Sequence, residues 1–153
     1  MIKVLVSACL VGHPVRYNGL AVPVQHPALE RWLAEGRVVP LCPEVAGGLS
    51  VPRPPAERVG DRVVTIYGVD VTANFRRGAE LALIAAQHHG VRLAILKEGS
   101  PSCGSKYIYD GTFTSKRLPG QGVTAELLAG EGIQVFNEHQ IDAAAAYLEE
   151  LSR

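Results

Sequence analysis

The chain has 153 residues, 47% of them apolar, and its 15 lysines and arginines balance its 15 aspartates and glutamates. This length allows one sizeable hydrophobic core, so we expect a single domain over residues 1–153. Because the net charge is zero, no overall field attracts a nucleic acid backbone or an anionic membrane, and an intact nucleic acid is not an expected partner.

The N-terminal part of the chain alternates short apolar runs with an amphipathic segment. Lys3–Val6 contains β-branched residues and is typical of a buried strand. Ala28–Glu35 follows a proline and ends at Gly36, a pattern that predicts a helix. Val38–Leu41 is a second predicted strand. The glycines and prolines between residues 47 and 55 predict a long irregular loop.

The C-terminal part continues this alternation. Arg62–Tyr67 is predicted to be one strand of a small exposed ribbon outside the core. A long helix is expected from about Phe75 to His89, with Thr72 or Asn74 as its N-cap. The remaining predicted elements are the strand Leu93–Leu96, the helix Thr124–Ala129, the strand Ile133–Phe136 and the helix Asp142–Leu151.

The order of these elements predicts the fold class. Strands that alternate with helices form mostly parallel sheets that are covered by helices on both faces. We therefore expect an α/β fold, a three-layer Rossmann-like domain with a mostly parallel sheet and a small β insertion.

Two features indicate a cytoplasmic protein. The longest apolar stretches, such as Leu81–Ala86, are far shorter than a membrane span, and the N-terminus has no secretion-signal pattern. Three cysteines are an odd number, which fits a disulfide framework poorly. Thiols in a reducing compartment more often bind metals or take part in chemistry.

The three cysteines are predicted to meet at one edge of the sheet. Cys9 and Cys42 stand at the carboxyl ends of two predicted strands, and Cys103 lies a few residues beyond a third. In open parallel sheets, the loops at the carboxyl ends of the strands form the ligand crevice. The alternative is that each cysteine is simply a small buried hydrophobic residue. Three cysteines at the same edge favour a shared site.

Three thiolates are compatible with several kinds of site. One is a zinc ion, which would need a fourth ligand such as His13 or His26, since the chain has no C-x-x-C pair. Another is a disulfide beside a third reactive thiol. A third is a four-iron cluster, in which three cysteines leave one iron open to water or substrate.

Several short motifs occur in one order along nearly the whole chain. They are Ser7–Gly12 (SACLVG), Arg16–Gly19 (RYNG), Cys42–Glu44 (CPE), Gly47–Leu49 (GGL), Pro52–Glu57 (PRPPAE), Lys97–Glu98 (KE), Ser100–Gly104 (SPSCG) and Tyr109–Phe113 (YDGTF). In these motifs the sequence resembles the family long catalogued as a domain of unknown function, number 523, which includes thiouracil desulfidases.

This resemblance implies an enzyme and a cofactor. The implied cofactor is a 4Fe-4S cluster held by Cys9, Cys42 and Cys103. The implied activity is that of a 4Fe-4S-dependent desulfidase: the open iron binds the sulfur of a thiolated nucleobase such as 2-thiouracil, the C–S bond is cleaved, and oxygen takes its place. Some members carry a further cysteine where this chain has Val15, which implies that a thiol at this position is dispensable.

Glu44 and Ser100 are the candidate catalytic residues. Glu44 is two residues from Cys42, and a carboxylate there could activate water for attack on the thiocarbonyl carbon. The alternative is a solvated loop acid or a cap on a backbone amide. Ser100 is assigned as its catalytic partner from the resemblance alone.

Five further residues are candidates for substrate binding. Arg16 and Tyr17 could hydrogen-bond and stack on a base. Lys97 could offset the charge of the thiolates, although a surface lysine would have no such role. The other two candidates are Ser102, whose alternative is an ordinary turn hydroxyl, and Tyr109, a possible wall of the pocket.

Two other functions remain open from the sequence. One is a zinc or thiol protein without iron. The other is a non-catalytic module that carries sulfur or binds a thiolated base. In the main interpretation, the partner is a small thiolated nucleobase or nucleoside.

Overall fold

A four-stranded parallel sheet forms the centre of the computed structural model, which describes all residues from 1 to 153. The strand order is β2-β1-β5-β8, and every neighbouring pair is parallel. The strands are β1 (Val4–Ser7), β2 (Val38–Leu41), β5 (Leu93–Leu96) and β8 (Gln134–Asn137). The two inner strands of the order, β1 and β5, are buried throughout. All four strands were predicted, two of them to the residue and the other two within one residue.

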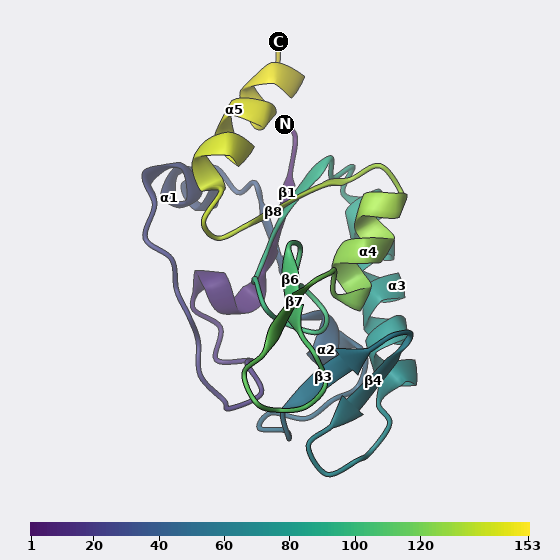
Figure 1. The fold of residues 1–153 in the computed structure, drawn as a ribbon. Coiled ribbons are helices and arrows are strands. Elements are labelled where there is room, and N and C mark those ends of the chain that lie inside the picture. Colours follow the sequence, from purple (N-terminus) through teal and green to yellow (C-terminus); the bar gives the residue numbers. More distant parts are fainter.

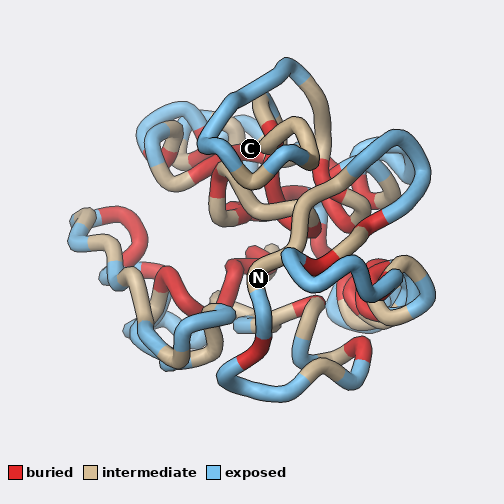
Figure 2. The backbone as a smooth tube through the Cα atoms, turned by 60° about the horizontal axis from the view of Figure 1, so that its bottom comes forward, coloured by how far each residue is buried: buried red, intermediate tan, exposed pale blue.

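Helices cover both faces of this sheet (Figure 1). On one face lie α1 (Pro27–Ala34) and α5 (Ile141–Leu151), and on the other lie α3 (Thr72–His88) and α4 (Val123–Gly130). The tube in Figure 2 shows buried backbone through the middle of the molecule and exposed loops around it. The predicted three-layer α/β fold with a parallel sheet is confirmed.

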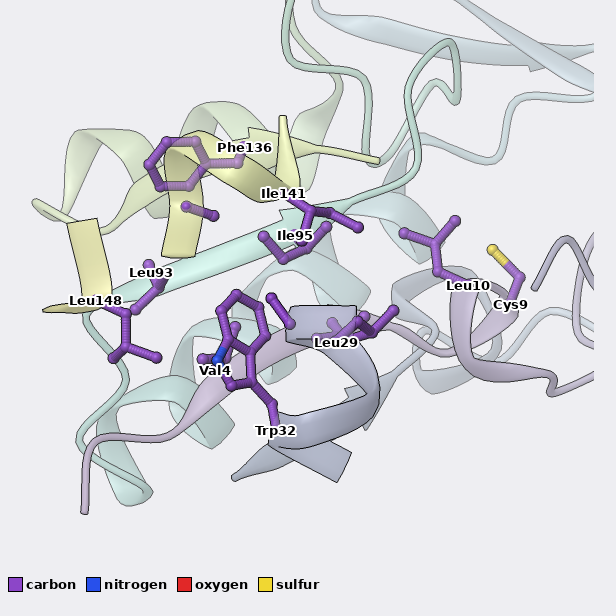
Figure 3. Close-up of a cluster of buried hydrophobic side chains, with 13 residues drawn as sticks. Val4, Cys9, Leu10, Leu29, Trp32, Leu93, Ile95, Phe136, Ile141 and Leu148 are labelled. Carbon is purple, nitrogen blue, oxygen red and sulfur yellow. The ribbon is translucent and has the colours of Figure 1, made fainter. Parts of the chain in front are cut away.

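The two faces of the sheet have separate hydrophobic cores, because side chains alternate along each strand. Val4 and Val6 point to the α1 and α5 side, and Leu5 points to the other. The first core also contains Leu29, Trp32, Leu93, Ile95, Phe136, Ile141 and Leu148 (Figure 3). The second core joins Leu5, Ala94 and Leu96 to Ala86, Ala125, Leu128 and Ile133.

The start of α3 differs from the prediction. The helix begins at Thr72 rather than Phe75, and its N-cap is Val71. The Thr72 hydroxyl accepts a hydrogen bond from the Val63 backbone N–H, and the Asn74 amide donates to the Gly47 carbonyl oxygen. Neither predicted cap therefore acts as one, because both side chains are engaged by neighbouring segments.

The predicted ribbon is an antiparallel pair of strands, β3 (Ala56–Val59) and β4 (Arg62–Thr65). Its first strand lies in a segment that directly follows the predicted loop, and its second is two residues shorter than predicted. The ribbon is also less exposed than expected: Val63 is fully buried and packs with Val71 and Phe75 in a small cluster apart from the two main cores.

Three short elements were not predicted. A one-turn 3-10 helix, Ala8–Val11, follows β1, and the short helix α2 (Pro43–Ala46) follows β2. The third is a hairpin of β6 (Tyr107–Tyr109) and β7 (Arg117–Pro119). None of the helices combines the length and the apolar character that a membrane span requires.

Helix α2 packs so closely on α3 that the contact requires glycine. A Cβ atom at Gly78 would lie 1.9 Å from the Pro43 carbonyl oxygen, and one at Gly47 would lie 2.0 Å from the Asn74 carbonyl oxygen. Any larger residue at either position would collide with backbone rather than with a flexible side chain. The position of α2, and of the residues it carries, is therefore fixed by the helix beneath it.

We expect Gly78→Ala to destabilise the protein by about 1–3 kcal/mol, because the added methyl group overpacks the α2–α3 contact. Urea unfolding at equilibrium measures this change. The matched control is Gly130→Ala at the end of α4, where a Cβ would meet nothing within 4 Å. That variant should be neutral or slightly more stable. Equal stability of the two variants would show that the close contact does not fix α2.

Candidate active site

A cavity of about 490 Å³ lies at the carboxyl edge of the parallel sheet. Its lining includes residues that follow β1, β2 and β5, together with residues of the β3–β4 ribbon and the β6–β7 hairpin. This is the place where open α/β sheets usually bind ligands. Cys9, Cys42 and Cys103 all line the cavity, so the structure brings the three thiols to one site as the sequence predicts.

Each cysteine is placed by its own short element. Cys9 lies in the 3-10 helix after β1, Cys42 is the N-cap residue of α2, and Cys103 lies in the turn Pro101–Cys103. All three are free thiols. Cys9 and Cys103 are buried, whereas Cys42 is half-buried and lies 3.8 Å from the Val15 carbonyl oxygen.

Burial makes these thiols hard to ionise on their own. It raises the pKa of Cys9 to about 11, and the neighbouring Cys42 adds to this effect. Burial also raises the pKa of Cys103 to about 12, against a hydrogen bond from Ser7 that lowers it. The pKa of Cys42 is raised for the same main reason. The three unpaired thiols around this cavity are soft donors, and each would be deprotonated on binding a metal centre.

The geometry does not favour the zinc alternative. No group of three or more histidine, cysteine, aspartate or glutamate side chains is arranged to hold a single metal ion. His26 uses both ring nitrogens elsewhere: Nδ1 accepts from the Ala28 backbone N–H, and Nε2 lies 2.8 Å from Asp142 Oδ1. His13 is exposed and does not line the cavity. Neither histidine therefore supplies the fourth ligand that zinc would need.

Glu44 lines the cavity and is held at both carboxylate oxygens. Its Oε1 accepts from Arg53 Nε at 3.1 Å, and its Oε2 accepts from the Ser100 hydroxyl at 3.3 Å. Ser100 Oγ in turn accepts from the backbone N–H groups of Ser102 and Cys103. The two candidate catalytic residues are thus in contact, and the serine connects Glu44 to the turn that carries Cys103.

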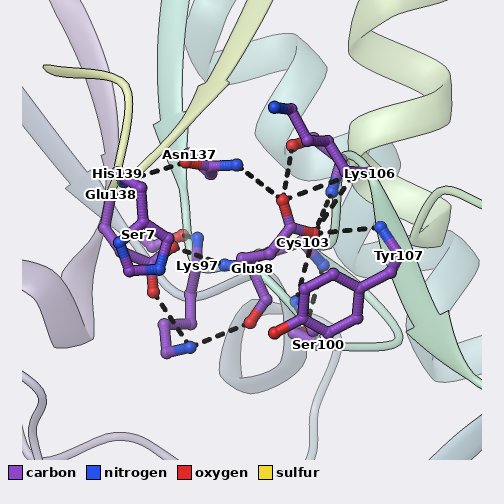
Figure 4. A network of polar contacts seen from close by, with 12 residues as sticks. Ser7, Lys97, Glu98, Ser100, Cys103, Lys106, Tyr107, Asn137, Glu138 and His139 are labelled. Carbon is purple, nitrogen blue, oxygen red and sulfur yellow. Dashed lines mark hydrogen bonds and ion pairs between the residues drawn. The ribbon is translucent and has the colours of Figure 1, made fainter. Parts of the chain in front are cut away.

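Glu98 organises the loop between β5 and β6 (Figure 4). This carboxylate is 3% exposed and accepts from the Asn137 amide at 2.7 Å and from the Ser105 hydroxyl at 3.0 Å. It also accepts from the backbone N–H groups of Gly99, Ser105, Lys106 and Tyr107. Burial acts to raise the pKa of Glu98, but these hydrogen bonds outweigh it and the pKa is lowered. An ionised carboxylate therefore holds both ends of the loop that carries Ser100 and Cys103.

Four of the five predicted substrate-binding residues line the cavity. Arg16 and Tyr17 lie together at its wall, with the guanidinium carbon 5.8 Å from the ring centre. Lys97 also lines the cavity, and its Nζ is paired with Glu138 at 3.0 Å. Tyr109 contributes from the end of β6.

Ser102 is the exception among the predicted site residues. Its side chain is fully buried, shares a 2.8 Å hydrogen bond with the Thr124 hydroxyl, and does not line the cavity. The structure therefore does not place Ser102 at the cavity with the other candidate residues. Proximity to Cys103 in sequence does not determine on which side of the turn a side chain lies.

Several lining residues were missed by the sequence analysis. Arg53 belongs to one of the recognised motifs, but no sequence signal indicates that its guanidinium is buried against Glu44. Tyr107 and Phe113 come from the unpredicted β6–β7 hairpin. Glu57 in the ribbon accepts from the backbone N–H groups of Gly111 and Phe113, which pins the hairpin loop to the ribbon beside the cavity.

Fold and site together define an α/β protein that has three unpaired cysteines and the Glu44–Ser100 pair in one cavity at the carboxyl edge of its sheet. Residues 4–140 match the 2-thiouracil desulfurase family, and the chain belongs to this family. The resemblance noted in the sequence is confirmed.

Two similar proteins cover nearly the whole chain. The uncharacterized protein YbbK of Bacillus subtilis (strain 168) is 41% identical over an alignment of 152 positions, and the match covers 91% of this chain and 97% of that protein. A solved structure of the [4Fe-4S]-dependent thiouracil desulfidase TudS is 54% identical, with a TM-score of 0.96 over 97% of this chain and 99% of that chain.

Proposed function

We propose that this protein is a [4Fe-4S]-dependent desulfidase that removes sulfur from a thiolated nucleobase such as 2-thiouracil and replaces it with oxygen. The observation that carries the proposal is the set of three free cysteines in one cavity beside the Glu44–Ser100 pair. The 54% identity to a thiouracil desulfidase supports it. The proposed substrate is a small molecule, either a free base or a nucleoside. The proposed location of the protein is the cytoplasm, where thiols stay reduced.

The residues present fit the cluster. Cys9, Cys42 and Cys103 would be its ligands, since thiolates are the usual donors to iron–sulfur clusters and each would bind a different iron. This requirement differs from that of a single ion, on which all donors must converge. Bound through three cysteines, a [4Fe-4S] cluster supplies one iron without a protein ligand, a Lewis acid with affinity for the substrate sulfur.

Glu44 is the general base of the proposed reaction. One water molecule attacks the thiocarbonyl carbon, its oxygen forms the new C–O bond, and the C–S bond breaks to release sulfide. The water gives up both protons, which end on sulfide, so the reaction requires no electron donor or acceptor. Glu44 accepts the first of these protons through Oε2, the oxygen that also faces the Ser100 hydroxyl.

The other lining residues hold the substrate and balance charge. In this proposal Arg16 and Tyr17 hydrogen-bond and stack on the base, and Tyr109 forms another part of the wall; the position of all three in the cavity lining supports these roles. Lys97 offsets part of the negative charge that three thiolates bring to the cavity, a contribution already visible as a lowering effect on the pKa of Cys9.

Sulfide release from 2-thiouracil tests the proposal. The anaerobically reconstituted protein should form uracil and sulfide in equal amounts, without added reductant. Protein treated with a chelator to remove iron is the control and should form neither. Binding of 2-thiouracil without release of uracil would favour a non-catalytic binding module instead. An active, colourless protein that contains zinc in place of iron would reject the cluster.

A further inference from the structure

Arg53 is a charged residue that is buried beside the proposed general base. Its side chain is 5% exposed, and the guanidinium donates three hydrogen bonds. Nε binds Glu44 Oε1 at 3.1 Å, Nη1 binds the Ser50 carbonyl oxygen at 3.1 Å, and Nη2 binds the Val15 carbonyl oxygen at 3.0 Å. Its backbone N–H also donates to the Tyr17 carbonyl oxygen at 2.8 Å.

These contacts make Arg53 the fixed member of the pair. Two backbone carbonyls hold the guanidinium, and one backbone hydrogen bond holds the main chain of Arg53, without any help from Glu44. A guanidinium is planar, and its donors point in set directions, so anchoring two of its nitrogens also fixes the direction of the third. The carboxylate of Glu44 must therefore adapt to Arg53, and not the reverse.

No other cation takes this role at Glu44. Lys97 is paired with Glu138 and with the Glu98 carbonyl oxygen. Arg16 forms no ion pair with Glu44, and its guanidinium lies over the Tyr17 ring. Arg53 is thus the single positive group in contact with the proposed base.

We propose that Arg53 is the positioning residue for Glu44. By occupying Oε1 it leaves Oε2 as the oxygen that faces Ser100 and the cavity, so that one defined oxygen takes the proton from water. This inference rests on the proposed function, because it assigns to Arg53 a role that acts through the general base.

A double-mutant cycle tests this role. The variants are Arg53→Met, Glu44→Gln and the two combined, each measured for kcat, KM for 2-thiouracil and iron content. Misplacing a catalytic group by about 1 Å can cost on the order of 10²-fold in rate, and we expect a loss of kcat of that size in Arg53→Met, with KM and iron content near those of the wild type. In the Glu44→Gln background, loss of Arg53 should reduce kcat no further.

A conservative variant and a matched control sharpen the cycle. Arg53→Lys keeps the charge but cannot reproduce three directed hydrogen bonds, and it should restore little of the lost kcat. Arg58 is a half-buried arginine that binds Glu126 and two backbone carbonyls outside the cavity, so Arg58→Met should leave kcat unchanged. A crystal structure of Arg53→Met should show the Glu44 carboxylate turned away from Ser100.

The outcomes separate this inference from the proposed function. If the wild-type protein releases no sulfide, both are overturned. If it does, but Arg53→Met lowers kcat equally in both backgrounds, only the inference fails, because Arg53 then does not act through Glu44. Full recovery of kcat by Arg53→Lys would likewise overturn positioning in favour of charge alone. Loss of both iron and activity in Arg53→Met would also overturn the inference. Arg53 would then support the cysteine ligands instead of Glu44, since the Val15 carbonyl oxygen that it binds also contacts Cys42 Sγ.

Discussion

Replacing Cys9, Cys42 or Cys103 by serine should abolish cluster binding and reduce sulfide release to background in each variant. A serine hydroxyl is a hard ligand that stays protonated near neutral pH, and the two remaining thiolates are too few to hold four irons. After anaerobic reconstitution, the wild-type protein should contain about four irons and four acid-labile sulfides. Iron content, sulfide content and visible absorption of each variant measure the loss.

Ser102→Ala is the control for these three variants. Ser102 is next to Cys103 in sequence but is buried against Thr124 outside the cavity. This variant should retain its iron and its KM for 2-thiouracil, at a modest cost in stability. Retention of a full cluster by any one of the cysteine variants would remove that thiol from the proposed ligand set.

Glu44→Gln should lower kcat by about 10²- to 10⁴-fold, the range that is typical for loss of a general base. The amide keeps the size of the carboxylate, and its oxygen can still accept from Arg53. It cannot accept a proton from water near neutral pH. The cluster should therefore remain intact, and iron content and absorption measured beside sulfide release would separate chemistry from assembly.

Glu57→Gln is the matched control for this variant. Glu57 also lines the cavity, but its Oε1 accepts from two backbone N–H groups of the β6–β7 loop. We expect a much smaller loss of kcat. Near-normal turnover in Glu44→Gln with a full cluster would exclude Glu44 as the base, whereas loss of iron with activity would make it a structural residue.

The sheet and its ligand edge could be predicted from sequence for a simple physical reason. Val38–Leu41 and Leu93–Leu96 are apolar runs bounded by turn residues, and parallel strands place their carboxyl ends at one edge. That rule alone predicts that Cys9, Cys42 and Cys103 lie close together. It needs only the order of the elements, and not the conformation of any loop.

The parts that could not be predicted depend on pairings between distant residues. Helix α2 is four residues long and is fixed by the contact of Gly78 with the Pro43 carbonyl oxygen, which no local pattern reveals. The strands of the β6–β7 hairpin have three residues each, too few to show an alternation. The burial of Arg53 and the inward turn of Ser102 likewise result from long-range packing.

The way in which Glu98 holds its loop has a consequence for how substrate preference can evolve. This carboxylate recognises the loop largely through backbone N–H groups, which every residue except proline possesses. The side chain of Tyr107 lines the cavity, while its backbone N–H binds Glu98. A change of side chain at this position can therefore reshape the substrate cavity while Cys103 stays in place. Selection, natural or in the laboratory, can alter the molecule that the site accepts without rebuilding the site that acts on it.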